Sequence, residues 1–339
     1  MKLDAKENSF QIRKKEKKPS VSLFINLKEP LIQACLPALL KDKTTHKNIV
    51  FATDSYQVFG ESFKANREIT RNCLGKMDLR PRVLKSLDEQ SQRTRQKAEV
   101  FTPSWLCCKM NNHCDEEWFG RPDVFNHLEG ESWKAKGGRI GFPAGKTWKD
   151  YVDSRRLEIT CGEAPYIVSR YDASTGASIP IRKRIGLLDR KLRVVNENAA
   201  DRAEWLKWTL RAFQSVYGYE WQGDSLLIAR INLLMTFIEY HEGRWGAIPA
   251  DDAFLKTASD IVNVIAWNFW QMDGLTGTVP YTALSEESDI SGQPGLFGED
   301  TKGFELQAAD EEDDRIQCRI FDWRSKYSMT YSSLRKGEK

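Results

Sequence analysis

The sequence lacks the features that mark membrane and secreted proteins. No apolar run approaches the 18 or so residues that a helix needs to cross a bilayer. The best apolar stretch near the N-terminus, Val21 to Leu27, is too short and lies too far into the chain for a secretory signal. A hydrophobic content of 40%, a charged content of 29% and a mean hydropathy of −0.55 are typical of a soluble globular protein. The 339 residues allow one large domain or two modest ones.

Cysteine pairs of the Cys-x-x-Cys type are also absent. The seven cysteines are odd in number and irregularly spaced, and without a secretory signal they predict reduced thiols and a cytoplasmic location. Cys107, Cys108, His113 and Cys114 have the residue types of a zinc site. Because structural zinc ligands usually come as two well-separated pairs, we interpret these residues as buried or incidental thiols and expect no bound metal.

The net charge is only +3, but the charges are unevenly distributed. Residues 1–100 hold 21 Lys and Arg against 12 Asp and Glu, whereas residues 285–314 hold 11 acidic residues and one basic residue. A basic segment attracts a phosphate backbone, which makes DNA a candidate partner. A solvated tail is the alternative explanation of the basic run at 13–18. The composition of the acidic segment predicts a flexible loop, and a DNA mimic is the alternative explanation of its charge.

The composition changes along the chain predict five regions. They are a basic flexible tail (1–20), an N-terminal extension (21–98), a main domain (99–325) containing an acidic flexible loop (282–315), and a C-terminal tail (326–339). The sequence contains no internal repeat.

Strand-like and helix-like patterns alternate along the chain. The predicted strands are Lys47–Thr53, Arg156–Thr160, Val216–Trp221, Ile261–Ile265 and Arg319–Asp322. Helical patterns cover Arg82–Gln90, a segment that Ser104 caps, Ala203–Ser215, and a segment from a capping Asp224 to about His241. Residues 120–150 are rich in Gly, Trp and Lys and predict a loop. This alternation favours an α/β fold with a mainly parallel sheet.

Three predicted strand ends carry groups suited to a nucleotide-like ligand. In open α/β sheets, ligands bind outside the carboxyl ends of the strands. The first strand end is Glu158-Ile159-Thr160-Cys161-Gly162, where Gly162 permits a tight turn and close approach of a ligand. The second is Glu220-Trp221, an acid placed to accept hydrogen bonds from ribose hydroxyls. The third is Asn268-Phe269, an amide beside an aromatic ring, which suits a purine.

Several of these segments resemble motifs of one family. Phe101-Thr102-Pro103 is similar to an N-terminal Phe-Thr-Pro motif, Cys161-Gly162 to a cofactor loop, and Ala229-Arg230-Ile231-Asn232-Leu233 to the helix after the ribose-binding strand. Over roughly residues 80–325 the chain resembles class I S-adenosylmethionine-dependent adenine-specific DNA methyltransferases, in particular proteins of the restriction endonuclease subunit M type. The resemblance implies a Rossmann-like methyltransferase fold behind a basic N-terminal extension, S-adenosylmethionine as cofactor, DNA as partner and a second subunit. The cofactor-binding residues that it implies are Phe101, Thr102, Pro103, Glu158, Thr160, Cys161, Gly162, Glu220, Trp221, Asn268 and Phe269.

The chain departs from this family at two places. Ala164-Pro165 follows Glu163 where the family has a second glycine, so an amide donor is lost and a negative charge is gained. The family's Asp/Asn-Pro-Pro-aromatic tetrapeptide is missing, because no Pro-Pro occurs in the sequence. Asp322 and Trp323 are the candidate catalytic residues in its place. Only 16 residues follow Trp323, so we expect base recognition to come from residues 1–100 or from another subunit.

Two other functions fit parts of the sequence. The chain is a candidate for a catalytically inactive methyltransferase-like subunit or scaffold that binds DNA or a partner. Asp172, with Asp189-Arg190-Lys191 on a presumed strand, is instead the acid and Asp-x-Lys pattern with which many nucleases bind a divalent ion.

Overall fold

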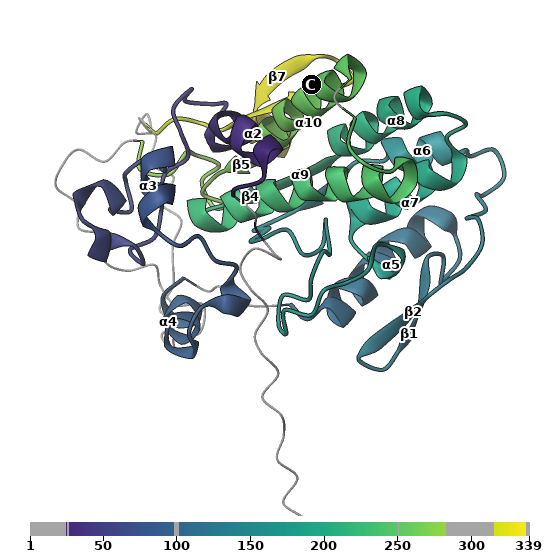
Figure 1. Ribbon diagram of the computed structural model, residues 1–339, viewed down its shortest axis with the longest axis horizontal. Helices are drawn as coiled ribbons and strands as arrows, with labels where there is room; N and C mark the ends of the chain where they lie inside the picture. The colour runs from purple at the N-terminus through teal and green to yellow at the C-terminus, as the bar shows by residue number, and fades with distance from the viewer. Residues whose placement is uncertain (1–24, 26, 98–101, 250, 283–314, 337–339) are drawn as a thin grey trace, which may run out of the picture.

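The computed structural model describes residues 25, 27–97, 102–249, 251–282 and 315–336, and shows a mixed helix-and-sheet fold around a three-stranded parallel sheet (Figure 1). The N-terminal part contains α2 (Pro30–Leu40), η1 (Gln57–Phe59), η2 (Glu61–Phe63), α3 (Arg71–Lys76), η3 (Arg82–Leu84) and α4 (Leu87–Lys97). It is followed by α5 (Ser104–Phe119), β1 (Asn126–Glu129), β2 (Ser132–Ala135), α6 (Trp148–Asp153), β3 (Arg156–Glu158), η4 (Ile181–Lys183), α7 (Leu187–Asn198) and α8 (Arg202–Gln214). The remaining elements are β4 (Val216–Glu220), α9 (Gly223–Trp245), α10 (Asp252–Asn268), β5 (Phe269–Gln271), β6 (Arg319–Asp322), β7 (Tyr327–Thr330) and α11 (Tyr331–Lys336).

The parallel sheet has the strand order β3-β4-β5. Leu157 pairs with Tyr217, and Gly218 pairs with Phe269, so the three strands end side by side at one edge. Each strand is joined to the next through helices, as parallel neighbours require. We call the edge where β3, β4 and β5 end the carboxyl edge, and the opposite one the amino edge.

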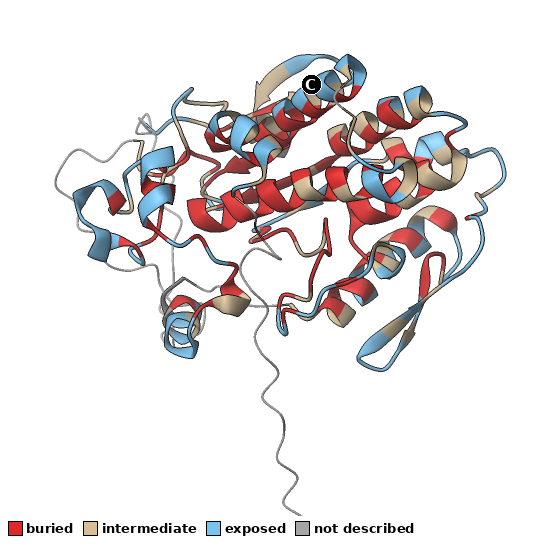
Figure 2. Cartoon of the chain, in the orientation of Figure 1, coloured by how far each residue is buried: buried red, intermediate tan, exposed pale blue. Residues whose placement is uncertain are grey.

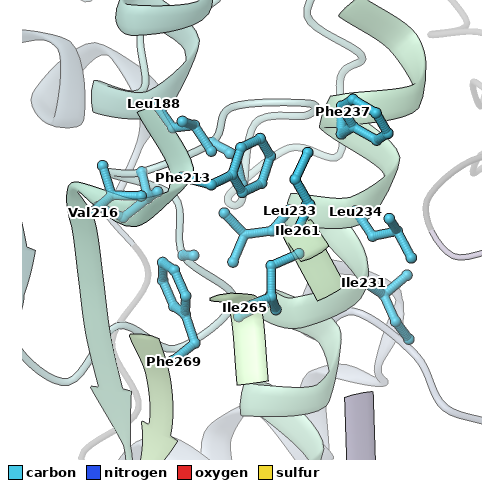
Figure 3. Packing of buried hydrophobic residues seen from close by; sticks show 14 of the residues in the cluster. Leu188, Phe213, Val216, Ile231, Leu233, Leu234, Phe237, Ile261, Ile265 and Phe269 are labelled. Carbon is cyan, nitrogen blue, oxygen red and sulfur yellow. The ribbon is translucent and has the colours of Figure 1, made fainter. Parts of the chain in front are cut away.

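Helices cover the face of the sheet that carries Val216 and Phe269. Figure 3 shows side chains of α7, α8, α9 and α10 packed against these two residues. Helix α9 is buried along most of its length (Figure 2), which agrees with apolar residues on all its sides. The buried cluster extends from Ile25 in the N-terminal part to Phe269.

The hairpin β6–β7 covers part of the other face, and β6 runs against the direction of the parallel strands. Cys318, just before β6, donates its thiol to the carbonyl of Gln271 at the carboxyl end of β5. Asp322, at the end of β6, accepts a hydrogen bond from Arg155, which precedes β3. The strand predicted at Arg319–Asp322 is confirmed as β6, but it pairs antiparallel with β7 in a separate sheet and does not join the parallel one.

The N-terminal part lies against the carboxyl edge. The amide of Val50 donates to Gln271 Oε1 over 2.9 Å, and the amide of Gly223 donates to the carbonyl of Phe51 over 2.9 Å. Only glycine fits at position 223, because a Cβ there would lie 1.9 Å from the carbonyl oxygen of Val50. The start of α9 is thereby tied to Phe51, and the end of β5 to Val50.

The sequence predicted several elements within one or two residues. The strands at 156 and 216 and the helix at 203–215 correspond to β3, β4 and α8. The helix predicted from Asp224 exists, but Gln222 is its N-cap and Asp224 lies in its first turn. Likewise Ser104 is the first residue of α5, and Pro103 is its N-cap.

Other element predictions are wrong. Ile261–Ile265 lies inside α10, which begins where the side chain of Asp251 accepts the amide of Phe254. Lys47–Thr53 forms isolated bridges rather than a strand, and the predicted loop at 120–150 contains the hairpin β1–β2. Arg82–Gln90 is divided between η3 and α4. Most of the predicted tail at 1–20 and loop at 282–315 lies outside the described residues.

Candidate functional site

The ends of β3 and β4 place two carboxyl groups and a glycine turn together at the carboxyl edge. The amide of Gly162 donates to Glu220 Oε2 over 2.8 Å, and the amide of Gln222 donates to Glu220 Oε1 over 3.1 Å. Glu220 is only 8% exposed. The structure therefore brings together the first and second of the three predicted strand ends.

The turn after β3 has an unusual backbone. Thr160, Gly162 and Ala164 have φ angles of +48°, +53° and +64°, and the left-handed region is costly for a β-branched residue such as Thr160. A Cβ added to Gly162 would meet no atom of the described residues within 4 Å. The backbone of Gly162 is thus open to a ligand.

Glu158 adds a second carboxyl group beside Glu220. Its Oε2 is buried and has no hydrogen-bond partner among the residues that the structure describes. Burial, together with the charge of Glu220, raises the pKa of Glu158 well above its usual value. The same two influences, burial first and then the carboxylates, raise the pKa of Cys161. Burial and the neighbouring carboxylate thus favour the protonated form of Glu158.

The carboxylate that Glu163 adds to the turn accepts hydrogen bonds from residues outside the turn. Its Oε1 accepts the amide of Arg82 over 2.7 Å, and its Oε2 accepts the hydroxyl of Tyr171 over 2.6 Å. The carbonyl of Glu163 also accepts the side-chain amide of Asn232 over 3.2 Å. Glu163 thus connects the turn to the N-terminal part and to α9.

The segment at the start of α5 lies near β3. The thiol of Cys107 donates to the carbonyl of Thr102, and the side chain of Tyr166 hydrogen-bonds Thr102. Burial, and next the nearby Glu158, raise the pKa of Cys107. Thr102 and Pro103 are therefore close to the end of β3, while Phe101 lies outside the described residues.

Asn268 and Phe269 do not belong to the carboxyl edge. Asn268 is the last residue of α10, and its side-chain amide donates to the carbonyls of Phe213 and Val216. Phe269 begins β5, and its ring packs against Gly218. Their placement at the end of a strand was wrong, because the strand expected at Ile261–Ile265 is a helix. Asn268 is buried at the amino edge.

The candidate catalytic residues lie at the amino edge as well. Asp322 Oδ1 accepts Arg155 Nη2 over 2.9 Å, and Trp323 Nε1 donates to Asn268 Oδ1 over 2.8 Å. Asp322 therefore lies at the opposite edge of the sheet from Gly162 and Glu220, because β6 runs toward the amino edge. Asp322 also lines a groove of about 220 Å³ there.

The three candidate nuclease residues serve different neighbours. Asp189 and Lys191 lie on α7 rather than on a strand, and side chains two apart on a helix do not face each other. Asp189 accepts the amide of Ser169, whereas Lys191 donates to carbonyls of the α6 segment. Asp172 accepts the amide of Ser104. Within the described ranges, no three His, Cys, Asp or Glu side chains are grouped so that they could hold a metal ion.

The motif in α9 has a structural role. Arg230 is fully buried, and its guanidinium donates to the carbonyls of Leu39, Lys41, Ala266 and Phe269. Burial lowers the pKa of Arg230 to about 10. The motif thereby ties α2, α10 and β5 to α9.

Sequence reasoning missed a buried charge cluster and a strand-end acid. Asp224 bonds Lys85 and Arg93 of the N-terminal part, and these two cations line a cavity of about 430 Å³. Asp273 follows β5 at the carboxyl edge, one residue after Met272, whose amide donates to the carbonyl of Glu220. If residues 252–268 had been predicted as a helix, the following residues would have been the next strand. Asp273 would then have been recognised as a third acid near a strand end.

Comparison of the chain with protein-family models, with curated proteins and with solved structures found no match. All seven cysteines are free. Among the described helices, none combines the length and the apolar character that crossing a bilayer demands.

Proposed function

We propose that the protein binds S-adenosylmethionine at the carboxyl edge of a Rossmann-like sheet, as a component of a cytoplasmic DNA modification system. The observation that carries this proposal is the pairing of Glu220 with the amide of Gly162, across the ends of two adjacent parallel strands. This is the place where ligands bind in open α/β sheets. Both residues were singled out from the sequence for this role.

The residues at the edge fit the ligand. Glu220 places a carboxylate, the group that accepts hydrogen bonds from ribose hydroxyls, beside the turn at Gly162. The space beside Gly162 admits a ligand to the backbone. Thr102 and Pro103 lie close to Glu158, on the side of β3. When bound, S-adenosylmethionine supplies an electrophilic methyl group.

The charges at the edge favour the same ligand. S-adenosylmethionine carries a sulfonium and an ammonium group against one carboxylate. Glu220 ends β4, Asp273 follows the last residue of β5 by two positions, and Glu158 adds a carboxyl group whose pKa is raised by burial. An acidic edge attracts a ligand of net positive charge.

The position of Asp322 favours a subunit that needs a partner for catalysis over a protein that methylates DNA alone. Asp322 and Trp323 bond groups at the amino edge, away from Gly162 and Glu220. We infer that a second subunit provides the residues that hold the target adenine. The basic N-terminal 100 residues are our candidate for the contact with DNA.

Isothermal titration calorimetry with S-adenosylmethionine and S-adenosylhomocysteine tests the binding site. Glu220→Gln keeps the shape but removes the charge, and the loss of charged hydrogen bonds should weaken binding by roughly 10- to 100-fold. Asp322→Asn is the matched control at the other edge and should bind as the wild type does. No heat at millimolar ligand, or equal affinity of wild type and Glu220→Gln, would contradict the proposal.

A further inference from the structure

The cavity of about 430 Å³ in the N-terminal part has the usual size of a small-molecule site. One wall comes from the chain at 53–59, which contains η1, and the other from the chain at 78–93, which contains η3 and most of α4. Among the described residues that line the cavity, none belongs to β4 or to the turn at Gly162. The cavity is therefore distinct from the pairing of Gly162 with Glu220.

Two buried cations line the cavity, and we call Lys85 and Arg93 the floor cations. Their side chains are only 7% and 4% exposed, and both bind the carboxylate of Asp224. An ammonium group has three donors. Within the described part of the chain, that of Lys85 makes one hydrogen bond, to Asp224 Oδ2 over 3.2 Å. Two donors of a buried cation are thus left for a ligand.

Two hydroxyl groups lie beside the floor cations. Thr53 and Ser55 both line the cavity, and their side-chain oxygens are 3.0 Å apart. Ser55 Oγ also accepts Arg93 Nη1 over 3.3 Å. One hydroxyl hydrogen serves the bond between Thr53 and Ser55, and the other can rotate toward an oxyanion. Lysine, arginine and hydroxyl side chains are among the groups with which proteins bind phosphate oxygens.

The acidic residues of the lining act less strongly on a ligand at this depth. All three are exposed, so water screens their charges more than those of the floor cations: Asp54, Asp78 and Glu89. Asp78 pairs with Arg80 over 2.6 Å, and Glu89 Oε2 accepts the amide of Ser86 over 2.7 Å. The buried end of the cavity therefore favours an anionic group.

Apolar side chains line the outer part of the cavity. Val58 is 87% exposed and Phe59 is 49% exposed, and both belong to η1. The ring of Tyr56 also lines the cavity, and its hydroxyl donates to Asp224. Exposed aromatic rings gain contact area and favourable ring geometry when another ring packs on them.

We propose that this cavity binds a small molecule that carries a phosphate group and an aromatic ring, as a nucleoside monophosphate does. The phosphate oxygens accept the donors of Lys85 that Asp224 leaves unused, together with a hydroxyl of Thr53 or Ser55. The ring of the ligand packs on Phe59. The inference goes beyond the proposed binding of S-adenosylmethionine and does not rest on it.

Isothermal titration calorimetry of the full chain, with phenyl phosphate and inorganic phosphate at constant ionic strength, tests this site. Both probes should bind, and phenyl phosphate should bind roughly 2- to 10-fold more tightly because its ring contacts Phe59. Lys85→Met should weaken both by about tenfold or more, because it removes the charged donors. Lys256→Met is the matched control, because Lys256 is exposed on α10, and it should bind both probes as the wild type does.

A second variant keeps the test decisive if Lys85→Met fails to fold, as judged by circular dichroism. Phe59→Ala changes an exposed side chain, so it should remove the advantage of phenyl phosphate and leave the affinity for inorganic phosphate unchanged. No heat with either probe at millimolar concentration overturns the proposal. Binding that a folded Lys85→Met variant leaves unchanged also overturns it, and so does an advantage of phenyl phosphate that survives in Phe59→Ala.

Discussion

Replacing Asp224 by asparagine should destabilise the protein strongly, because it leaves two buried cations without a counter-charge. Asp224 Oδ2 lies 3.2 Å from Lys85 Nζ and 3.0 Å from Arg93 Nη1, and it accepts the hydroxyl of Tyr56 over 3.0 Å. The side chain of Asp224 is fully buried, and those of Lys85 and Arg93 are 7% and 4% exposed. Breaking a buried charge pair by removing one partner costs about 3–5 kcal/mol. The contact between the N-terminal part and α9 should therefore weaken.

The pH dependence of stability should change with this substitution. Burial opposes the charged form of Asp224, but the charges of Arg93 and Lys85 outweigh it and hold the pKa well below its usual range. A depressed pKa contributes stability above the unfolded-state value of about 3.9, and this stability is lost as the pH falls through the folded-state pKa. The difference between wild type and Asp224→Asn should therefore be full at pH 7 and shrink below about pH 4.

Urea unfolding, followed by circular dichroism at pH 7, measures the cost. The midpoint should fall without a change in slope, because the surface exposed on unfolding is unchanged. Asp260→Asn is the control, since Asp260 pairs with Lys256 on an exposed helix face and should cost no more than about 0.5 kcal/mol. Equal costs for Asp224→Asn and Asp260→Asn would refute the reasoning that the cluster holds the N-terminal part in place.

The remaining predictions concern packing and DNA. Gly223→Ala should destabilise the protein by about 1–3 kcal/mol or more in thermal unfolding, because its Cβ would lie 1.9 Å from the carbonyl oxygen of Val50. Gly243→Ala, in the same helix, meets only Ile181 Cδ1 at 3.3 Å and should stabilise by about 0.5–1 kcal/mol; the reverse order of the two variants would contradict the structure. DNA affinity should fall steeply with salt, and a chain lacking residues 1–24 should show a shallower slope in fluorescence anisotropy. Equal slopes would exclude the tail from the contact.

Local patterns were sufficient for the elements whose signals lie within the element itself. Helix α8 alternates apolar and polar residues at helical spacing and starts at a capping Asp201, so its bounds followed from the sequence. β4 ends at an acid and is followed by a helix, which made Glu220 recognisable. The proximity of Gly162 to Glu220 also follows from parallel pairing, because such strands end at one edge.

The errors arose where the decisive contacts are distant in sequence. The run Ile261–Ile265 is apolar throughout, and such a run does not distinguish a buried strand from a buried helix. The capping Asp251 was the signal that could have corrected this assignment, and with it the position of Asn268. The direction of β6 depends on its pairing with β7 and on the bond between Asp322 and Arg155, neither of which a local pattern contains. The engagement of Glu163 by Arg82 is likewise a contact across 81 positions.

A crystal structure with S-adenosylhomocysteine bound tests the central claim most directly. The account predicts that the ribose hydroxyls of the ligand bond Glu220 and that its chain passes over Gly162, at the carboxyl edge. A ligand found in the 430 Å³ cavity between Tyr56 and Arg93, or in the groove beside Asp322, would contradict it.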